Sequence, residues 1–342
     1  MEERLYCGID LHKNFSAICL MNKEGTVFEE RKLQHIGDIF KSYFRERDPM
    51  ECVVEPVENW GWVVDYLAEA GHRVHLANTY KVRLIAESRV KTDRVDAKVL
   101  ADLLRTGYLP EGYVAPIELR DQRAYLRYRI GLVRERSRLK NQVKRLLRVE
   151  NVGEPSYTDT FGKKGWKWLE EIQLRPVNER IKGERLEAIK YYNGHIEQLD
   201  SEIKLKSRDN ETIRHLMTVP GIGQLTAHMI MAEVGDMNRF ASAKRFAGYT
   251  GLVSSQRSSA DKTHHGHITK QGNKHMRWLL VEAAQKAKTL DINLKLFFDR
   301  IAYKKGKGAA HVALARKLAE ICWHIVIDNV PYDSGKVCRQ IG

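Results

Sequence analysis

Four acidic residues in the first third of the chain are spaced so that they could hold metal ions. Asp10 and Glu55 each lie at the end of an apolar run that predicts a strand, and Asp93 and Asp96 are three residues apart, on one face of a predicted helix. Ligands bind at strand ends along one edge of an α/β sheet. Carboxylates that converge there repel one another unless divalent cations lie between them, and Mg²⁺ or Mn²⁺ suits such oxygen ligands.

A pair of such ions about 4 Å apart can stabilise both the attacking and the leaving oxygen of a phosphoryl transfer. Other interpretations stay open on these residues alone. Asp93 and Asp96 could simply complement a helix dipole. The tripeptide that ends at Asp10 is also typical of the actin and sugar-kinase fold, but there a phosphate loop rich in Gly, Ser and Thr follows, whereas this chain continues with Leu11, His12 and Lys13.

A second group with possible chemistry lies in the last third, in a stretch rich in Ser, Lys, Arg and His. Ser258 and Ser259 are flanked by Arg257 and Lys262. A serine in a loop beside cations could attack a phosphodiester or contact a phosphate. Three histidines follow, at His264, His265 and His267. Because no paired Cys or carboxylate residues accompany them, phosphate contact or proton transfer is favoured over zinc binding.

The first third must supply the sheet that positions the acids. The apolar runs that predict strands lie at 4–10, 15–21, 26–33, 50–56 and 72–78. The segments that predict helices lie at 37–46, 60–70 and within 92–104. Three antiparallel strands followed by alternating helices and strands is the order of the ribonuclease H-like fold. We therefore predict an α/β domain followed by helical parts.

The middle of the chain predicts a long basic helix. Residues 120–148 hold eleven Lys and Arg residues against two acids, a net charge of +9. Apolar residues recur three or four apart here and again at 186–203, and the segment between, 151–165, predicts a loop, so an antiparallel helical hairpin or coiled coil is expected. A run of one sign repels itself without a counter-ion. This favours a phosphate-binding face that also dimerises over a merely solvated face.

The last third predicts a turn that could bind phosphate. The sequence PGIG at 220–223, followed by an amphipathic helix, is like half of a helix-hairpin-helix, in which the turn presents backbone N–H groups to a phosphate. A plain helix start that contains glycine is the alternative. Further helices are expected at 275–288 and 309–327, with a flexible basic segment at 304–308.

Composition restricts the partners and the compartment. The chain has 342 residues, a net charge of +14 and an isoelectric point near 9.4, which points to a polyanion, usually nucleic acid. No apolar run approaches a membrane span, and the opening MEERLYCGID has no secretory signal. The five cysteines are scattered and never spaced CxxC, which argues against disulfides and for a reducing compartment.

Together these stretches resemble one known family, the transposases of insertion sequence family 110, which are related to the Piv DNA invertases. The matching stretches are GIDLHK (8–13), VVEPVENWGW (53–62), KTDRVDAKVLADLL (91–104), TVPGIGQLTA (218–227), GYTGLV (248–253) and GHITKQGNKHMRWLLVEAA (266–284). They keep the family's order and spacing over essentially the whole chain.

The resemblance implies three domains. It implies a RuvC-like domain of ribonuclease H fold at 1–112, with a DEDD metal site. It implies a coiled-coil middle at 113–210 that mediates assembly into a dimer or tetramer, and a mostly helical C-terminal transposase domain at 211–342 with a catalytic serine. By motif position the metal ligands and catalytic acids are Asp10, Glu55, Asp93 and Asp96.

The serine is assigned by counting from the flanking motifs. In the family it lies in a Ser-Gly pair a few residues after GLVP, whereas this chain has Ser254 in place of the proline and Ala260 in place of the glycine. Counting from both sides places the nucleophile at Ser259, with Ser258 as its neighbour. The nucleic-acid contacts that we predict are Arg134, Arg138, Lys140, Lys144, Arg145, Gly221, Gly223, Arg257, Lys262 and Lys270.

Family members are similar in using a structured non-coding RNA, the bridge RNA, that pairs with donor and target DNA. The implied function is an RNA-guided DNA recombinase that works through a Mg²⁺-dependent phosphoserine intermediate, in the bacterial or archaeal cytoplasm at the nucleoid. Two alternatives remain: a RuvC-like junction endonuclease that uses water, and a non-catalytic nucleic-acid-binding protein in which the acids are structural.

Overall fold

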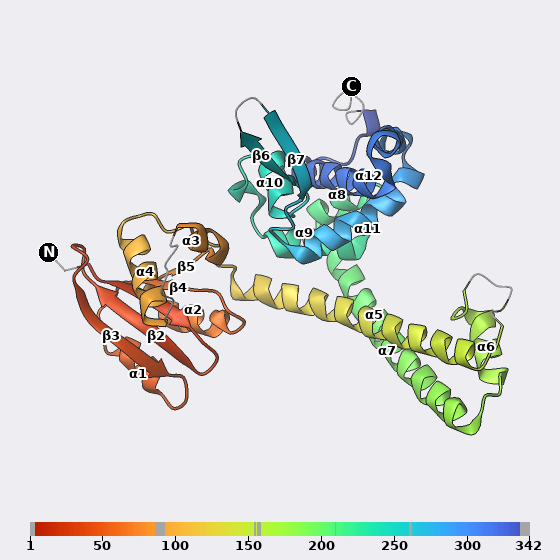
Figure 1. Cartoon of the computed structure of the whole chain (residues 1–342), viewed down its shortest axis with the longest axis horizontal. Helices are drawn as coiled ribbons and strands as arrows, with labels where there is room; N and C mark the ends of the chain where they lie inside the picture. Colours follow the sequence, from red (N-terminus) through yellow and green to blue (C-terminus); the bar gives the residue numbers. More distant parts are fainter. Residues whose placement is uncertain are drawn as a thin grey trace. The chain divides into compact units, whose positions relative to one another are not determined.

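The computed structural model describes residues 4–85, 93–153, 155, 159–208, 210–259 and 262–335. The chain separates into two units, Met1–Ala115 and Pro116–Gly342 (Figure 1). The first unit is α/β and the second is mostly helical, which confirms the predicted classes. The division into three domains stays a prediction.

A mixed sheet of five strands forms the first unit, in the order β3-β2-β1-β4-β5. The strands are β1 (Tyr6–Leu11), β2 (Phe15–Met21), β3 (Val27–Gln34), β4 (Glu51–Val54) and β5 (Arg73–Leu76). The first three are antiparallel, and β4 and β5 run parallel to β1. The predicted strands and their order along the chain are therefore confirmed.

Helices cover both faces of this sheet. They are α1 (Ile39–Arg45), α2 (Trp60–Glu69), α3 (Thr79–Ile85) and α4 (Asp93–Arg105). Side chains of a strand alternate between the two faces. Ile9 and its odd-numbered neighbours on β1 belong to the core cluster with α1 and α2, whereas Tyr6 packs on the opposite face with Ala97 and Ala101 of α4. Asp10 follows the even positions and so faces the side of α4.

Two long helices, α5 (Ile117–Val149) and α7 (Pro176–Arg208), lie side by side in the second unit, with α6 (Lys163–Glu171) between them in sequence (Figure 1). At about 1.5 Å per residue each is roughly 50 Å long. The apolar stripes meet as predicted, for example Val143 with Ile189. The predicted loop is shorter than expected, because α6 already begins at Lys163.

The remainder of the second unit is a helical core that also holds one end of the hairpin. Its elements are α8 (Glu211–Met217), α9 (Gln224–Val234), η1 (Met237–Arg239), α10 (Ala243–Tyr249), β6 (Ser254–Ser259), β7 (Lys262–Ile268), α11 (Lys274–Leu290) and α12 (Ile292–Asp328). Leu126 and Ile130 of α5 pack with Met229 of α9 and Leu279 of α11. The basic helix is thus anchored in this core.

One local prediction was wrong. The serine-rich stretch is not a loop but an antiparallel hairpin of β6 and β7. Its strands are almost entirely polar, so no apolar alternation indicated them. The basic segment 304–308 contains a kink within α12 at Gly306, where the backbone is not helical and φ is +83°. The predicted flexibility of this segment stays a prediction. No helix in the described part of the chain is long and apolar enough to cross a membrane.

Candidate metal centre and nucleic-acid interface

Asp10 lies at the centre of a group of metal-binding side chains. It is 6% exposed on β1, and its Oδ2 is 3.2 Å from Nε2 of His12. The same imidazole nitrogen is 3.4 Å from Oδ1 of Asp93, at the start of α4. One ligand atom from each of the three residues lies within 4.8 Å of the others. The Asp93 side chain is 51% exposed, so the group opens to solvent on that side.

Several negative charges lie near Asp10 at this edge of the sheet, and they affect its pKa. The pKa of Asp10 is raised to about 6, mainly by burial; the charge of His12 lowers it, and the charges of Glu55, Asp96 and Asp93 contribute to the rise. Glu55 continues the β4–β1 ladder, because its backbone N–H donates to the carbonyl of Ile9 at 3.1 Å. The charges of the other three predicted acids therefore reach Asp10, but among the described residues only Asp93, together with His12, brings a ligand atom within 4.8 Å of those of the group. A shared site for all four acids stays a prediction, and a divalent cation there would relieve their repulsion.

The close approach of α4 to β1 depends on Gly8. A Cβ atom at this position would overlap the carbonyl oxygen of Ala97 and stand 2.6 Å from the backbone nitrogen of Ala101. Asp93 precedes Ala97 by one helical turn, so the helix that rests on Gly8 brings the Asp93 carboxylate to the sheet edge beside Asp10 and His12. Asp96 directly precedes Ala97, and its charge also reaches Asp10.

His12 is a site residue that the sequence reasoning did not select. Its ring stacks on Phe15 with centroids 4.4 Å apart, and its backbone carbonyl accepts a hydrogen bond of 3.2 Å from Nδ2 of Asn59. Asn59 belongs to the stretch that follows Glu55, so two of the recognised motifs meet here. The available signal was the spacing: His12 is two residues from Asp10, on the same face of an extended chain.

The donor set fits a divalent cation. Carboxylate oxygens suit Mg²⁺ and Mn²⁺, and an added imidazole nitrogen is more compatible with Mn²⁺ than with Mg²⁺. The buried Asp10, whose pKa is raised, is the kind of group that a bound cation would stabilise in its charged form.

Ser258 and Ser259 lie on β6 in the second unit, whereas the acids belong to the first. In the backbone register Ser259 pairs with Lys262 and Ser258 pairs with Thr263. The side chains at 256–265, Arg257 among them, and residue Ala260 lie outside the described part of the structure. Both serines are thus placed at the end of β6 that leads into the hairpin turn.

One glycine of the PGIG turn is required by the backbone conformation and by packing. Gly221 has φ +83°, and a Cβ atom there would overlap the carbonyl oxygen of Ala283 in α11. Gly223 is exposed, caps α9 through its backbone alone and has open space around the position of a Cβ. Lys270 is also exposed, in the segment between β7 and α11. Phosphate contact by these residues stays a prediction.

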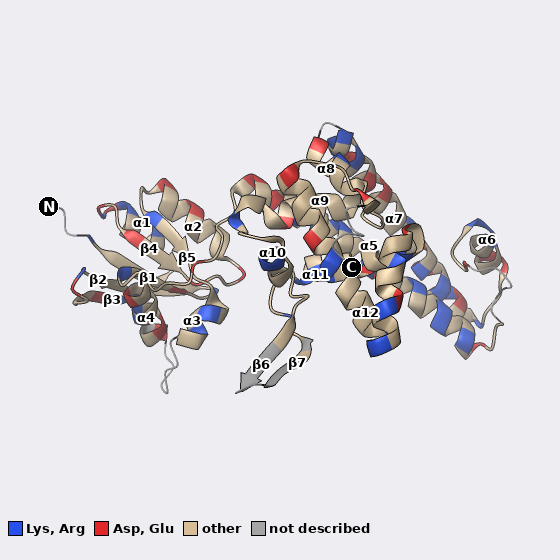
Figure 2. Ribbon diagram, turned by 90° about the horizontal axis from the view of Figure 1, so that it is seen from above, with Lys and Arg blue, Asp and Glu red and all other residues tan. Residues whose placement is uncertain are grey.

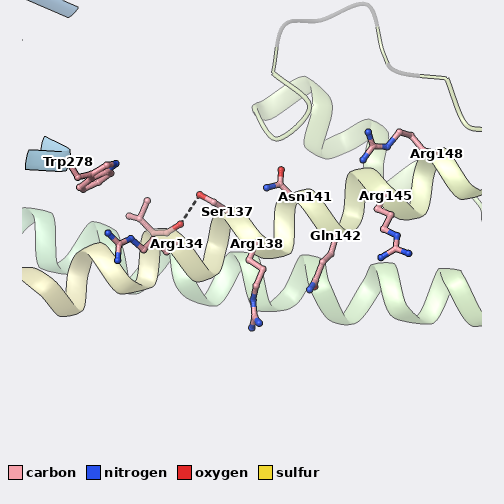
Figure 3. Close-up of a pocket in the computed structure, with 9 residues that line it drawn as sticks. Arg134, Ser137, Arg138, Asn141, Gln142, Arg145, Arg148 and Trp278 are labelled. Atoms are coloured by element: carbon pink, nitrogen blue, oxygen red, sulfur yellow. Dashed lines mark hydrogen bonds between the residues drawn. The ribbon is translucent and has the colours of Figure 1, made fainter. Parts of the chain in front are cut away.

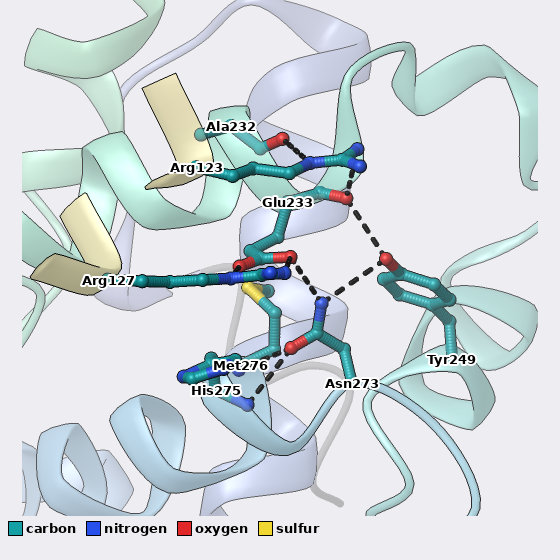
Figure 4. A network of polar contacts seen from close by, with 8 residues as sticks. All are labelled: Arg123, Arg127, Ala232, Glu233, Tyr249, Asn273, His275 and Met276. Atoms are coloured by element: carbon teal, nitrogen blue, oxygen red, sulfur yellow. Dashed lines mark hydrogen bonds and ion pairs between the residues drawn. The ribbon is translucent and has the colours of Figure 1, made fainter. Parts of the chain in front are cut away.

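Lys and Arg residues recur along the hairpin of α5 and α7 (Figure 2), but part of this charge is neutralised inside the protein. Arg127 makes two bonds of 2.7 Å to the carboxylate of Glu233, which is 1% exposed (Figure 4). Arg123 donates to the backbone carbonyls of Ala232 and Glu233. Arg129 is paired with Asp200 at 2.7 Å. These arginines hold α5 to α7 and α9.

Asn273 completes the polar network around Glu233 and ties it to the start of α11. Its Nδ2 donates to the Glu233 carboxylate at 2.6 Å, and its Oδ1 accepts from the backbone N–H groups of His275 and Met276 (Figure 4). The Tyr249 hydroxyl donates to the backbone carbonyl of Glu233 at 3.0 Å. The network therefore connects α5, α9, α10 and α11.

A different face of α5 forms a groove of about 580 Å³ with Trp278 of α11 at one end (Figure 3). Its lining residues are Val133, Arg134, Ser137, Arg138, Asn141, Gln142, Arg145, Arg148 and Trp278. Three predicted contacts, Arg134, Arg138 and Arg145, lie here. Lys140 does not line this groove, since its Nζ lies 4.9 Å from the ring centroid of Phe161, and Lys144 does not line it either.

Two family models match the chain over separate segments. Residues 213–298 match the model of the transposase IS116/IS110/IS902 family, and residues 7–151 match a DEDD transposase model named for IS110. The first segment holds the Gly221 turn and both serines, and the second holds all four acids and the whole of α5.

Known proteins align with nearly the whole chain. The transposase for insertion sequence element IS1328 of Yersinia enterocolitica is 28% identical over 95% of this chain and 97% of its own length. The transposase for insertion sequence element IS1111A of Coxiella burnetii is 25% identical over 98% and 93%. The pilin gene-inverting protein of Moraxella bovis is 23% identical over 96% and 98%.

Proposed function

Because the chain belongs to the IS116/IS110/IS902 family of transposases, we propose that it is the recombinase of an insertion sequence, which cuts and rejoins donor and target DNA. The observation that carries this proposal is the group of Asp10, His12 and Asp93, which lies within the segment that matches the DEDD model. The similarity to a gene-inverting protein supports rejoining, because inversion of a segment requires that cut strands be joined again.

The first unit is proposed to be a RuvC-like domain of ribonuclease H fold. Three antiparallel strands, two further parallel strands and the order β3-β2-β1-β4-β5 support this assignment. Asp10, Glu55, Asp93 and Asp96 would hold Mg²⁺ or Mn²⁺. When bound, such an ion would polarise the scissile phosphate and lower the cost of forming a nucleophilic oxygen.

The protein's own residues divide the remaining work. His12, whose Nε2 lies close to both Asp10 and Asp93, would add an imidazole ligand to this set. The proposed nucleophile is Oγ of Ser259. Its bond to phosphorus forms while the bond from phosphorus to the leaving strand's oxygen breaks, and the serine proton passes to that oxygen. The phosphodiester energy is conserved in the protein–DNA ester, so the strands can be rejoined by the reverse reaction.

Assembly is part of the proposal, since the acids and the serine belong to different units. We propose a homodimer or homotetramer held by the helical hairpin of α5 and α7 as a coiled coil. The groove on α5 supports a second nucleic-acid partner, a structured bridge RNA that selects the DNA by base pairing while arginines hold its backbone. With DNA and RNA as partners, the protein acts in the cytoplasm, at the nucleoid.

Cleavage of DNA that carries an element end tests this function. In Mg²⁺ or Mn²⁺, with the RNA encoded beside the gene, Asp93→Asn should lose cleavage and keep nucleic-acid binding. Asp102→Asn is the matched control, because Asp102 lies on the same helix but pairs with Arg105 at 2.6 Å. Full cleavage by Asp93→Asn would contradict the metal assignment. Cleavage that releases free ends and never rejoins them would favour the junction endonuclease instead.

A further inference from the structure

One side of the groove between α5 and Trp278 is lined by a row of arginines. Arg134, Arg138, Arg145 and Arg148 recur at spacings of three, four or seven residues, so they follow one face of the helix over about 21 Å. No Asp or Glu is among the described residues that line it. Glu135 pairs with Arg138 at 2.8 Å, but both side chains are largely exposed. The arginines of this face therefore keep their positive charge available to a ligand, whereas Arg123, Arg127 and Arg129 are paired inside the protein.

Trp278 gives the groove a feature that phosphate binding alone does not require. Its neighbours on α11, Met276, Leu279 and Leu280, are buried in the core, whereas the Trp278 side chain is 38% exposed and faces the groove (Figure 3). The guanidinium carbon of Arg134 lies 5.4 Å from the centroid of its ring. A large, partly exposed indole at the end of a row of arginines is the combination that binds unpaired bases, by stacking, and their phosphates, by charge.

An exposed aromatic ring favours single strands over duplexes. In a duplex the faces of the bases are already stacked, and only phosphates and groove edges are offered to a protein surface of this kind. A single strand can present a free base to the ring, as in most sequence-independent single-strand binding sites. The polar side chains of Ser137, Asn141 and Gln142 line the groove between the arginines.

We propose that this groove binds a single-stranded segment of nucleic acid, with one unpaired base stacked on Trp278 and the adjoining phosphates on Arg134, Arg138 and Arg145. The guanidinium carbon of Arg134 already lies over the Trp278 ring, 5.4 Å from its centroid, so a base that stacks on this face must displace it. Arg134 therefore occupies the position of the base in the free protein and turns to a phosphate when the base arrives.

This inference rests on the proposed function, which supplies two sources of single strand. One is an unpaired loop of the guide RNA, and the other is a DNA strand separated during recombination. Both offer the same chemistry, a free base between phosphates. Comparison of RNA and DNA oligonucleotides of equal sequence identifies the source, and tighter binding of either one supports the proposal.

The test measures binding of the full-length protein to labelled 15-nucleotide unstructured RNA, the same DNA strand and the corresponding duplex, at several salt concentrations. Trp278→Ala should weaken single-strand binding roughly five- to hundredfold and leave duplex binding within about twofold. The slope of log K against log salt should not change, because no phosphate contact is lost. Trp278→Phe should restore most of the affinity, since a phenyl ring still stacks.

Trp166→Ala is the matched control, because Trp166 also lies beside a cation, with Lys190 Nζ 5.3 Å from its ring centroid, but does not line the groove. A 2-aminopurine base in the oligonucleotide should be quenched by the wild type and not by Trp278→Ala. Unchanged single-strand affinity in Trp278→Ala, or an equal loss on the duplex, would overturn the inference while the recombinase function stands. A wild type that binds no nucleic acid would overturn both.

Discussion

Gly8 of β1 lies directly against Ala97 of α4, with no space for a Cβ atom between them. This contact sets the distance between the strand that carries Asp10 and the helix that carries Asp93 and Asp96. Among the described glycines of the first unit, Gly8 has the closest contact, and it belongs to the packing that holds Asp93 near Asp10. A small change at Gly8 should therefore affect the chemistry.

Gly8→Ala should damage both stability and cleavage. The added methyl group must push α4 away from β1, at a cost of about 1–3 kcal/mol in the free energy of unfolding. A displacement of about 1 Å at the carboxylates should lower the cleavage rate about 100-fold. Gly131→Ala on α5, where nothing lies within 4 Å of an added Cβ, is the control and should be neutral or slightly stabilising. Wild-type activity in a stable Gly8→Ala protein would contradict this account.

The pKa of Asp10 predicts how stability changes with pH. That pKa is raised by burial to about 6 in the folded protein, whereas an unfolded Asp titrates near 3.9. Folding therefore takes up a proton between these values, and the free energy of unfolding falls as pH rises from about 4 to about 6. In the wild type this decrease in the free energy of unfolding should be of the order of 2 kcal/mol, and it should be absent in Asp10→Asn. Denaturant unfolding at a series of pH values measures it.

A bound divalent cation should restore the stability that the folded protein loses when the buried Asp10 becomes charged. At pH 7.5, Mg²⁺ or Mn²⁺ at about 100 times its dissociation constant should stabilise the wild type by about 2.7 kcal/mol, and chelation should remove the effect. Asp10→Asn should gain little, whereas Asp102→Asn should gain as much as the wild type. Equal stabilisation of all three proteins would show that the ion binds elsewhere.

The arginines of α5 should separate into two functional groups. Arg127→Gln leaves the buried Glu233 without its ion pair and should lower the free energy of unfolding by about 2–4 kcal/mol, with little effect on the salt dependence of binding. Arg145→Gln should leave stability within about 0.5 kcal/mol and reduce the log–log salt slope by about 0.7–0.9. Reversed behaviour of the two variants would contradict the assignment of the groove.

The sequence predicts the local parts of this structure well. Asp10 and Glu55 could be placed at strand ends, and Asp93 and Asp96 on a helix, because the apolar periodicity around them is regular. His12 escaped selection because its role depends on the distance to Asp93, which lies 81 positions further on. The pairing of Arg127 with Glu233 spans 106 positions, so the charge of α5 alone could not show which arginines are neutralised.

The same limit applies to the polar hairpin and to Trp278. Strands β6 and β7 have no apolar alternation, so their pairing is visible only in the backbone hydrogen bonds. Trp278 lies in a helix whose apolar residues predict burial, and nothing in its own segment shows that Arg134 lies beside it. Positions set by contacts between distant segments have no local signal.

Detection of a covalent protein–DNA adduct tests the central claim most directly, because it separates a recombinase with a serine nucleophile from a hydrolase. Wild-type protein with labelled element-end DNA, the guide RNA and Mg²⁺ should give a product that survives denaturing gel electrophoresis. Ser259→Ala should bind nucleic acid and metal but give no such product, whereas Ser258→Ala should keep it. An identical adduct in Ser259→Ala would move the nucleophile elsewhere, and cleavage by the wild type without any adduct, even on a suicide substrate, would contradict the covalent mechanism.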